Sequence, residues 1–471
     1  MKKTKIVCTI GPSCKEEDKL LKMIDSGMDV ARINMSHASH DFVEDIIKKV
    51  RKINEALHKN IGILIDTKGP EIRVGTFANG YIELVDGEVV TLTPEDVHGE
   101  NNRIHISSKE LSSCLDIDNL ILIDDGSIEL VVIGINNSEI TCRVKQGGVL
   151  KNNKGINIPG NELTEDFLSI ADKNDILFAS RLNVDYIALS FVRDANDVLD
   201  VNDILIDEKN EHTQIISKIE CKNAIDDIDN IIKVSDGIMV ARGDLGVEIK
   251  LEKIPCIQKD IIKRVRDNGK VCIVATEMLA SMEENQRPTR AEVSDVANAV
   301  IDGVDAVMLS GETAVGMYPI ETVDTMKKII IETENNLDYH ELLVDRYTEN
   351  CDVTGVLAYS TVDAANMLKS KAIVVSTMSG YTAKRVSNYR PPCPIIATTP
   401  EIDTATGLSL YWGVIPMIVD KCNSTDEIVE ASLDIAKKNV ELKPNDKIII
   451  TGGFPVKKNK STNFIKVEEI E

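Results

Sequence analysis

The sequence lacks the features that mark membrane, secreted and nucleic-acid-binding proteins. No apolar run reaches the length of a transmembrane helix, and the lysine-rich start from Met1 to Lys5 leads into a short apolar stretch without a signal-peptide cleavage site. Its ten cysteines are scattered from Cys8 to Cys422 and none lies in a C-x-x-C pair, which argues against disulfides and zinc. The net charge of −23 repels nucleic acid and anionic membranes. We therefore expect a cytoplasmic protein with reduced thiols and with neither nucleic acid nor membrane as a partner.

What the sequence does contain is enough material for two or three domains. Its 471 residues, 43% of them hydrophobic and 28% charged, exceed what one hydrophobic core usually organises. Apolar runs of strand length recur with room for a helix between them, which is typical of a parallel α/β architecture. The first eight runs are 4–10, 28–35, 61–67, 184–192, 214–220, 237–243, 271–278 and 306–312. Eight βα units predict a TIM (β/α)8 barrel if the long segment between the third and fourth runs is set aside.

That intervening segment, residues 70–157, differs in kind from the barrel. Turn dipeptides such as Asn79-Gly80 and Asp125-Gly126 separate short β-rich runs, which predicts a small β-barrel. The segment interrupts a βα loop, and in such barrels these loops carry the chemistry, so we expect the inserted module to act as a lid.

After residue 332 the pattern changes to an open α/β sheet. Helical stretches there alternate with apolar runs at 372–377, 394–399, 414–419 and 447–451. The predicted domains are therefore a catalytic barrel (1–69 and 158–332), an inserted lid (70–157) and a C-terminal α/β regulatory domain (333–471).

Ionisable residues stand at the carboxyl ends of the predicted barrel strands. Lys218 and Glu220 are two residues apart on the fifth run, so their side chains share a face, and Asp244 follows the neighbouring sixth run. Two carboxylates without a nearby histidine suit a hard divalent cation that keeps some water, Mg²⁺ or Mn²⁺. Gly243 allows an anionic substrate group to approach the backbone amides where a helix begins.

Three other strand ends are also polar. The residues are Arg32, Asn34 and Ser36 on the second run, Asp66 and Thr67 on the third, and Thr276 on the seventh. The alternation along the second run turns its three side chains the same way, and an arginine there supplies planar donors for phosphate oxygens. The neutral and acidic oxygens can enclose a second, monovalent cation. A single charge pair at a strand end is more often an inert ion pair, but polar groups at these five strand ends and at the end of the eighth run together favour a functional site.

Long stretches of the chain resemble the signature motifs of the pyruvate kinase family. In chain order they are TKIVCTIGP (4–12), ARINMSH (31–37), DTKGPEIR (66–73), ALSFVR (188–193), SKIE (217–220), ARGDLG (241–246), RPTRAE (287–292) and MLSGETA (308–314). So many long motifs in the same order are far more specific than one short motif. The resemblance implies transfer of the phosphoryl group of phosphoenolpyruvate to ADP, giving pyruvate and ATP in glycolysis, with Mg²⁺ and K⁺ as cofactors and a homotetramer as the assembly.

The resemblance also implies a role for each matching residue. Lys218 stabilises the transferring phosphoryl group, and Glu220 and Asp244 bind Mg²⁺. The residues implied to contact phosphoenolpyruvate are Arg32, Gly243, Asp244 and Thr276, with Arg32 and Thr276 also catalytic. Those implied to hold K⁺ are Asn34, Ser36, Asp66 and Thr67, and those implied to contact the nucleotide are Asn34, Arg73 and Lys154. In the family a glutamate at the position of Glu71 accompanies the K⁺ requirement, so we expect K⁺ dependence.

Two positions depart from the family pattern. Cys221 stands where the family usually has asparagine and Ala280 where it usually has glutamate. Neither position binds metal or substrate in the family, so we expect altered activity rather than its loss.

The C-terminal part carries a candidate regulatory loop. The stretch 376–382 resembles the sugar-phosphate loop of family members activated by fructose 1,6-bisphosphate, which implies effector contacts from Ser376, Thr377, Ser379 and Thr382. An ordinary Ser/Thr-capped helix start is the alternative. Trp412 lies in a stretch that also resembles the effector region. The last loop, 455–463, has lysines where the family loop is rich in glycine, which leaves the identity of the effector open.

Two other functions are alternatives to this one. A Mg²⁺-dependent lyase or aldolase acting on pyruvate enolate would use a similar carboxylate pair, but it needs neither the lid nor Lys218. A non-catalytic sugar-phosphate sensor would need only the C-terminal domain, and the intact set of Lys218, Glu220, Asp244 and Thr276 argues against a barrel without activity.

Overall fold

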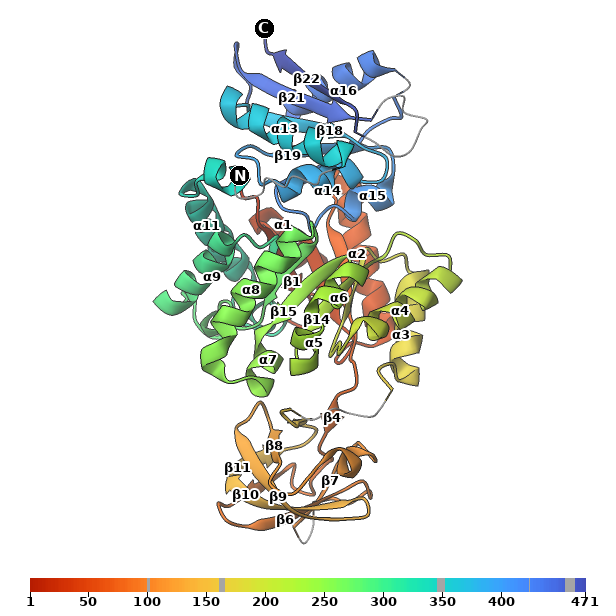
Figure 1. The fold of residues 1–471 in the computed structure, drawn as a ribbon, viewed down its shortest axis with the longest axis vertical. Coiled ribbons are helices and arrows are strands. Elements are labelled where there is room, and N and C mark those ends of the chain that lie inside the picture. The colour runs from red at the N-terminus through yellow and green to blue at the C-terminus, as the bar shows by residue number, and fades with distance from the viewer. Residues whose placement is uncertain (100–101, 161–165, 345–351, 423, 454–461) are drawn as a thin grey trace.

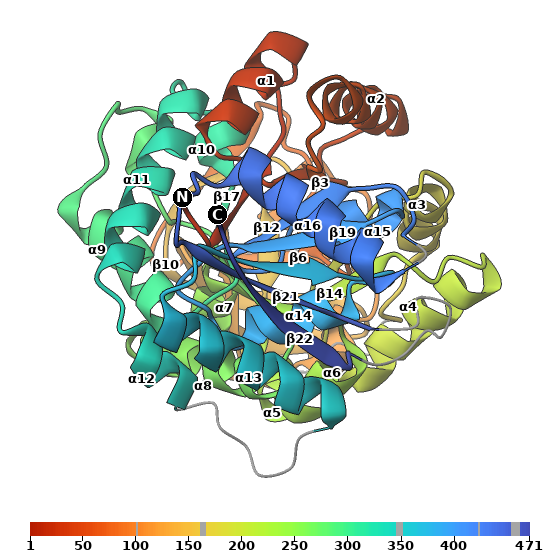
Figure 2. The same cartoon turned by 90° about the horizontal axis from the view of Figure 1, so that it is seen from above.

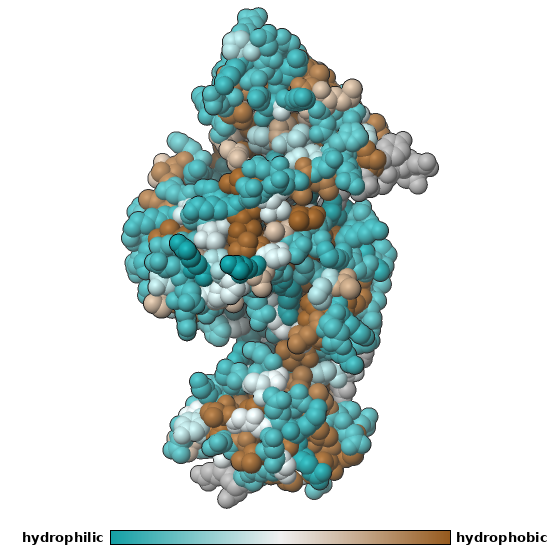
Figure 3. All heavy atoms as spheres, turned by 90° about the vertical axis from the view of Figure 1, so that its left-hand side faces the viewer, coloured by the Kyte–Doolittle hydropathy of each residue, from teal (hydrophilic) through white to brown (hydrophobic). Residues whose placement is uncertain are grey.

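The computed structural model describes residues 1–99, 102–160, 166–344, 352–422, 424–453 and 462–471. They form three parts stacked along the long axis, with a β-rich part at one end, a barrel in the middle and an α/β sheet at the other end (Figure 1). The surface narrows where the β-rich part meets the barrel, and hydrophobic residues line this waist (Figure 3). Within the described ranges, no helix has the length and apolarity needed to span a membrane.

The middle part is a closed barrel of eight parallel strands in the order β1-β17-β16-β15-β14-β13-β3-β2. In chain order the strands are β1 (Lys5–Thr9), β2 (Val30–Asn34), β3 (Gly62–Asp66), β13 (Tyr186–Leu189), β14 (Gln214–Ile219), β15 (Gly237–Ala241), β16 (Val271–Ala275) and β17 (Ala306–Leu309). Each strand lies within one of the eight apolar runs, so the TIM barrel prediction is confirmed.

Helices surround the barrel strands on the outside (Figure 2). They are α1 (Glu17–Ser26), α2 (His40–Leu57), α3 (Ile170–Arg181), α4 (Ala195–Asp207), α5 (Lys222–Asp226), α6 (Ile228–Val234), α7 (Arg242–Glu248), α8 (Ile254–Asp267), α9 (Arg290–Asp302), α10 (Gly311–Ala314) and α11 (Pro319–Asn335). Short 3-10 turns occur at Leu251–Lys253 and Ala280–Glu283. Local sequence sets several helix starts: α9 begins with a capping box between Thr289 and Glu292, which satisfies backbone N–H groups that have no partner inside the helix.

The barrel strands are apolar on both faces because both faces are buried. On β1, Ile6 and Cys8 belong to the outer core beneath the helices, whereas Val7 belongs to the core inside the barrel. Side chains alternate along a strand, so a strand covered on both sides reads as a continuous apolar run rather than an alternating one. At the carboxyl ends this inner face becomes polar, and the candidate site lies there.

The inserted part is a curved seven-stranded sheet in the order β4-β12-β8-β9-β10-β6-β7, with a small two-stranded sheet, β11-β5, beside it. The strands are β4 (Ile72–Arg73), β5 (Tyr81–Leu84), β6 (Val89–Thr93), β7 (Arg103–His105), β8 (Leu120–Ile123), β9 (Ile128–Asn136), β10 (Glu139–Gln146), β11 (Gly148–Lys151) and β12 (Gly155–Asn157), with a 3-10 turn at Leu111–Cys114. An isolated antiparallel bridge between Val74 and Ile106 joins the two edges, so the sheet curls toward a barrel. The predicted insertion of a small β-rich domain between β3 and β13 is confirmed.

The C-terminal part is a five-stranded sheet in the order β20-β19-β18-β21-β22. Its elements are α12 (Tyr339–Val344), α13 (Val353–Leu368), β18 (Ala372–Ser376), α14 (Tyr381–Asn388), β19 (Ile395–Thr399), α15 (Ile402–Thr406), β20 (Val414–Ile418), α16 (Thr425–Asn439), β21 (Lys447–Gly452) and β22 (Phe464–Glu469). The first four strands are parallel, as expected, whereas the antiparallel edge strand β22 was not predicted by the apolar runs. On β18, Ile373 shares a core with α13 and α14, whereas Val374 shares one with α16, so helices cover both faces of the sheet.

The sheet lies across the amino end of the barrel (Figure 2), and one hydrophobic core runs through the junction. Barrel-interior residues such as Val7 and Leu64 belong to the same buried cluster as Leu410 and Tyr411 of the C-terminal part. An aspartate precedes every second barrel strand at this end and accepts a hydrogen bond from a backbone N–H of the strand before. The pairs are Asp29 with Ile6 (2.8 Å), Asp185 with Ile63 (2.8 Å), Asp236 with Ile215 (2.9 Å) and Asp305 with Cys272 (2.9 Å).

Candidate active site

Two adjoining cavities open at the carboxyl end of the barrel. The deeper one, of about 160 Å³, lies inside the barrel mouth and contains most of the predicted substrate and metal residues. The larger one, of about 390 Å³, lies between the barrel and the lid. Both are lined by His37, Glu71, Arg73, Phe191 and Asp244.

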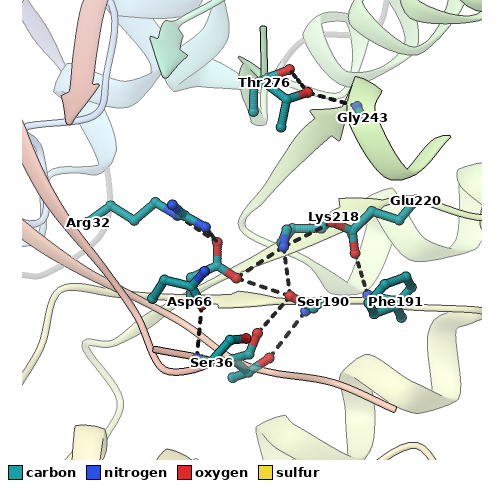
Figure 4. A network of polar contacts seen from close by, with 12 residues as sticks. Arg32, Ser36, Asp66, Ser190, Phe191, Lys218, Glu220, Gly243 and Thr276 are labelled. Carbon is teal, nitrogen blue, oxygen red and sulfur yellow. Dashed lines mark hydrogen bonds and ion pairs between the residues drawn. The ribbon is translucent and has the colours of Figure 1, made fainter. Parts of the chain in front are cut away.

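Four charged side chains form a network on the inner face of the barrel (Figure 4). Arg32, Asp66, Lys218 and Glu220 are only 1% to 8% exposed. The Arg32 guanidinium contacts Asp66 Oδ2 at 2.7 Å, while Lys218 Nζ lies 3.1 Å from Asp66 Oδ1 and 2.9 Å from Glu220 Oε1. Strand pairing brings Arg32 close to Asp66, because β2 pairs with β3 in a register that aligns Asn34 with Asp66. Lys218 comes from β14 of the same barrel.

Burial and charge act in opposite directions on these groups. Burial alone would raise the pKa of Asp66, but Arg32 and Lys218 outweigh it and hold that pKa below its usual value. Burial disfavours the charged form of Lys218, yet Asp66 and Glu220 raise its pKa above the ordinary value. For Glu220, burial prevails over the attraction of Lys218 and raises the pKa to about 7, and burial likewise raises the pKa of Asp244. The positive charge near the Glu220 and Asp244 carboxylates is therefore too small to offset the cost of burying these groups in their charged form.

This shortage of positive charge fits a divalent cation. Glu220 Oε1 is buried and accepts no hydrogen bond, although Lys218 Nζ lies within ion-pair distance, while Oε2 accepts the backbone N–H of Phe191 at 2.7 Å. In the described part of the chain, no group of three or more His, Cys, Asp or Glu side chains is arranged to hold a metal. Two carboxylates alone suit Mg²⁺, which keeps several waters and takes further oxygens from a substrate.

Thr276 and Gly243 face each other across the top of the site (Figure 4). The Gly243 N–H donates to Thr276 Oγ1 at 2.8 Å. Thr276 has a φ of +66° and Glu277 one of +54°, a conformation that is costly for a β-branched residue. Arg242 supports this turn by donating to the Thr276 carbonyl at 2.6 Å, and Asp295 holds the same guanidinium at 2.7 Å.

The residues expected to hold K⁺ come together beside the charged network. Asn34, Ser36 and Thr67 line the deeper cavity, and Asp66 is buried behind them. Asn34 Oδ1 accepts the backbone N–H of Ser36 at 3.0 Å. The side-chain oxygens of Asp66 already contact Arg32 and Lys218.

The residues expected to bind nucleotide are divided between the two cavities. Arg73 lines both, Lys154 lines only the larger one, and Asn34 lines only the deeper one. Both basic side chains form ion pairs with nearby carboxylates. Arg73 donates to Glu71 at 2.7 and 2.9 Å, and Lys154 contacts Asp124 at 2.7 Å.

The two departures from the family pattern lie outside the charged network. Cys221 lines the larger cavity, donates to the Val192 carbonyl at 3.4 Å, and has a pKa that burial raises to about 11, which disfavours its thiolate form. Ala280 is exposed at the start of a 3-10 turn.

Sequence reasoning overlooked Ser190 and Phe191, which contact Lys218 and Glu220 directly. Both lie in the motif ALSFVR, but nothing in a single sequence shows which side chains this motif meets. The signal that could have found them is their position immediately after β13, at the same end of the barrel as the other strand-end residues.

A third cavity, of about 510 Å³, lies in the C-terminal part. The four residues predicted to contact an effector, Ser376, Thr377, Ser379 and Thr382, all line it. Trp412 does not; it is buried where the sheet meets the barrel, beside the Arg390 guanidinium. Most of the lysine-containing last loop, 454–461, lies outside the described residues.

Comparison with known proteins agrees with this geometry. Residues 1–323 match the family "Pyruvate kinase, barrel domain" and residues 356–468 match "Pyruvate kinase, alpha/beta domain". The pyruvate kinase of Sporosarcina psychrophila is 44% identical over 473 residues, which cover 100% of this chain and 81% of that protein. The pyruvate kinase of Geobacillus stearothermophilus is also 44% identical, over 100% of this chain and 80% of its own length. Two matched domains and identity along the full chain show that it belongs to the pyruvate kinase family, with the activity of a pyruvate kinase.

Proposed function

We propose that the deeper cavity binds phosphoenolpyruvate and that ADP enters from the larger cavity between barrel and lid. The observation that carries this proposal is the buried network of Arg32, Asp66, Lys218 and Glu220, which places two fixed cations at the mouth of the barrel. Phosphoryl transfer needs alignment and charge neutralisation more than covalent help, and these cations are held in place before substrate arrives.

Each residue has a role that its surroundings support. Arg32 and Lys218 would bind the phosphoryl oxygens, and Lys218 would stabilise the charge that develops during transfer. Glu220 and Asp244 would hold Mg²⁺, which supplies neutralisation of phosphate and carboxylate oxygens when bound. The Gly243 N–H, which donates to Thr276 Oγ1, would donate to the substrate carboxylate instead. The Thr276 hydroxyl donates its proton to the Ala275 carbonyl, so its oxygen would accept a hydrogen bond from the proton donor for the enolate and orient it.

Nucleotide binding would exchange ion pairs on the lid side. Arg73 and Lys154 pair with Glu71 and Asp124, and the phosphates of ADP would replace these acids as partners. The K⁺ ion would lie among Asn34, Ser36, Asp66 and Thr67. Movement of the lid toward the barrel would exclude water that could otherwise accept the phosphoryl group.

Further features complete the proposal. We assign the domains to 1–69 with 158–332, 70–157 and 333–471, and the location to the cytoplasm. The cavity lined by Ser376 and Thr382 would take a sugar-phosphate effector.

The chain would assemble with further copies into a homotetramer. Two features of the C-terminal part support such contacts: exposed apolar side chains on α13, including Val353, Val356 and Met367, and the open edge of β22.

The assay that tests this function couples pyruvate formation to lactate dehydrogenase. We expect turnover that requires phosphoenolpyruvate, ADP, Mg²⁺ and K⁺ together, and a Glu71→Gln variant whose activity depends less on K⁺. Absence of ADP-dependent pyruvate with both cations present would reject the proposed reaction. Equal activity in K⁺ and in a large organic cation would reject the K⁺ site alone. Formation of pyruvate without ADP would favour the lyase alternative.

A further inference from the structure

The turn that follows β13 contacts both partners of the Lys218–Glu220 pair. Lys218 Nζ donates to Ser190 Oγ at 2.7 Å, and the Phe191 N–H donates to Glu220 Oε2 at 2.7 Å (Figure 4). Phe191 has a φ of +56°, which is uncommon for a bulky residue. Two consecutive residues therefore orient the lysine and the carboxylate, and the backbone is strained where they do so.

The Ser190 hydroxyl links Lys218 to the loop after β3. Its oxygen lies 2.7 Å from the Thr67 carbonyl and 3.1 Å from Asp66 Oδ1. A hydroxyl carries one proton, so it donates to one of these oxygens while its lone pair accepts from Lys218. The side chain is 3% exposed, so water does not compete for these bonds.

The loop after β3 also contacts the backbone of the turn after β13. The Ser190 N–H donates to Thr67 Oγ1 at 3.2 Å, and the Thr67 N–H donates to the Ala188 carbonyl at 2.9 Å. Gly69 has a φ of +72°, and a Cβ at that position would lie 2.8 Å from the Ser190 carbonyl oxygen. The close approach leaves Ser190 little freedom to move, which suits a residue that holds another in place.

We propose that Ser190 is a positioning residue for phosphoryl transfer, which rests on the proposed role of Lys218. A lysine has a flexible stem and a point charge, so its ammonium group needs several fixed partners to occupy one place. Asp66 and Glu220 attract the ammonium group by their charge. Ser190 holds it from a third direction, on the side of the loop after β3. Without it the ammonium group is free to move toward either carboxylate and away from the transferring phosphoryl group.

The test compares two buried serines that lie close together. Ser217 precedes Lys218 on β14, is fully buried, and pairs its hydroxyl with Ser235 at 2.7 Å away from the site. We expect Ser190→Ala to lower kcat about tenfold to a hundredfold while the KM for phosphoenolpyruvate changes less than about threefold. The matched control Ser217→Ala loses a buried hydroxyl as well and should keep kcat within about twofold.

A double-mutant cycle separates positioning from a general structural effect. Since Ser190 acts through Lys218, Ser190→Ala should lower kcat no further in a Lys218→Ala background. Ser190→Cys, which is slightly larger but keeps a weak donor and acceptor, should lie between the natural chain and Ser190→Ala, and it carries the test if the alanine variant does not fold.

The outcomes distinguish this inference from the proposed function. Unchanged kcat in Ser190→Ala, or an equal loss in the Lys218→Ala background, would overturn the positioning role alone. Unchanged kcat in Lys218→Ala would overturn the role of the lysine and the inference with it.

Discussion

Asp185 provides a pH-dependent test of how the barrel meets the C-terminal sheet. Its carboxylate is 6% exposed, and in the described part of the chain no lysine or arginine forms an ion pair with it. Burial raises its pKa to about 6, against the hydrogen bonds from Thr406 and Ile63 and the attraction of Arg51; Asp403 raises it further. The related residues Asp29 and Asp305 each form an ion pair with a basic side chain.

The sign of the effect follows from the raised pKa. Above the ordinary value of 3.8 the unfolded chain releases this proton, whereas the native chain keeps it up to about pH 6. The free energy of unfolding should therefore fall as pH rises through this window. A shift of about two pKa units corresponds to roughly 3 kcal/mol, and roughly half of this loss develops above pH 5.

The perturbation is Asp185→Asn, which keeps an acceptor for the Ile63 N–H but cannot ionise. The free energy of unfolding of this variant minus that of the natural chain should increase by about 1.5 kcal/mol between pH 5 and pH 7.5, measured from urea unfolding curves. Asp207→Asn is the control, because that residue is exposed at the end of α4. A stability difference for Asp185→Asn that stays constant with pH, or that falls, would refute the reasoning.

Two further substitutions test other parts of the molecule. Arg73→Met should raise the KM for ADP at least about tenfold and the KM for phosphoenolpyruvate by much less, because Arg73 lies on β4 of the inserted part and only borders the deeper cavity besides lining the larger one. Equal increases in both KM values in steady-state kinetics would contradict this placement. Arg390→Met should cost about 3–5 kcal/mol, because it leaves Asp305, 2.7 Å away and also buried, without its close partner. Urea midpoints check this loss, which Asp305→Asn in the same chain should partly restore; an unchanged midpoint in the single variant would show that the pair is not needed.

Much of the architecture could be predicted from apolar runs. The barrel strands are buried on both faces, so each left a mostly apolar run, and the parallel strands β18, β19, β20 and β21 left recognisable runs too. The edge strand β22 could not be predicted from an apolar run, because its side chains are half-buried or exposed and include Lys466, Glu468 and Glu469. A strand that depends on pairing with one neighbour carries little signal of its own.

The candidate site was predictable as a set of residues but not as a network. Alternation along the strands predicted that Lys218 and Glu220 would share a face, and the ion pair agrees with it. The strained turns at Phe191 and Thr276 could not be anticipated, because neither residue type favours a positive φ. Tertiary contacts hold them there.

The sequence by itself determined which segments form the barrel strands, where the β-rich insertion lies, the family and the residues that end the barrel strands. These follow from periodicity and motifs, which are local properties of the chain. Only the tertiary structure decided which partner each residue has: Ser190 with Lys218, Glu71 with Arg73, and Asp124 with Lys154. Two of these pairs join segments far apart in the chain, and all depend on side-chain geometry. The register of neighbouring strands and the closure of the barrel fix that geometry, and no local pattern encodes it.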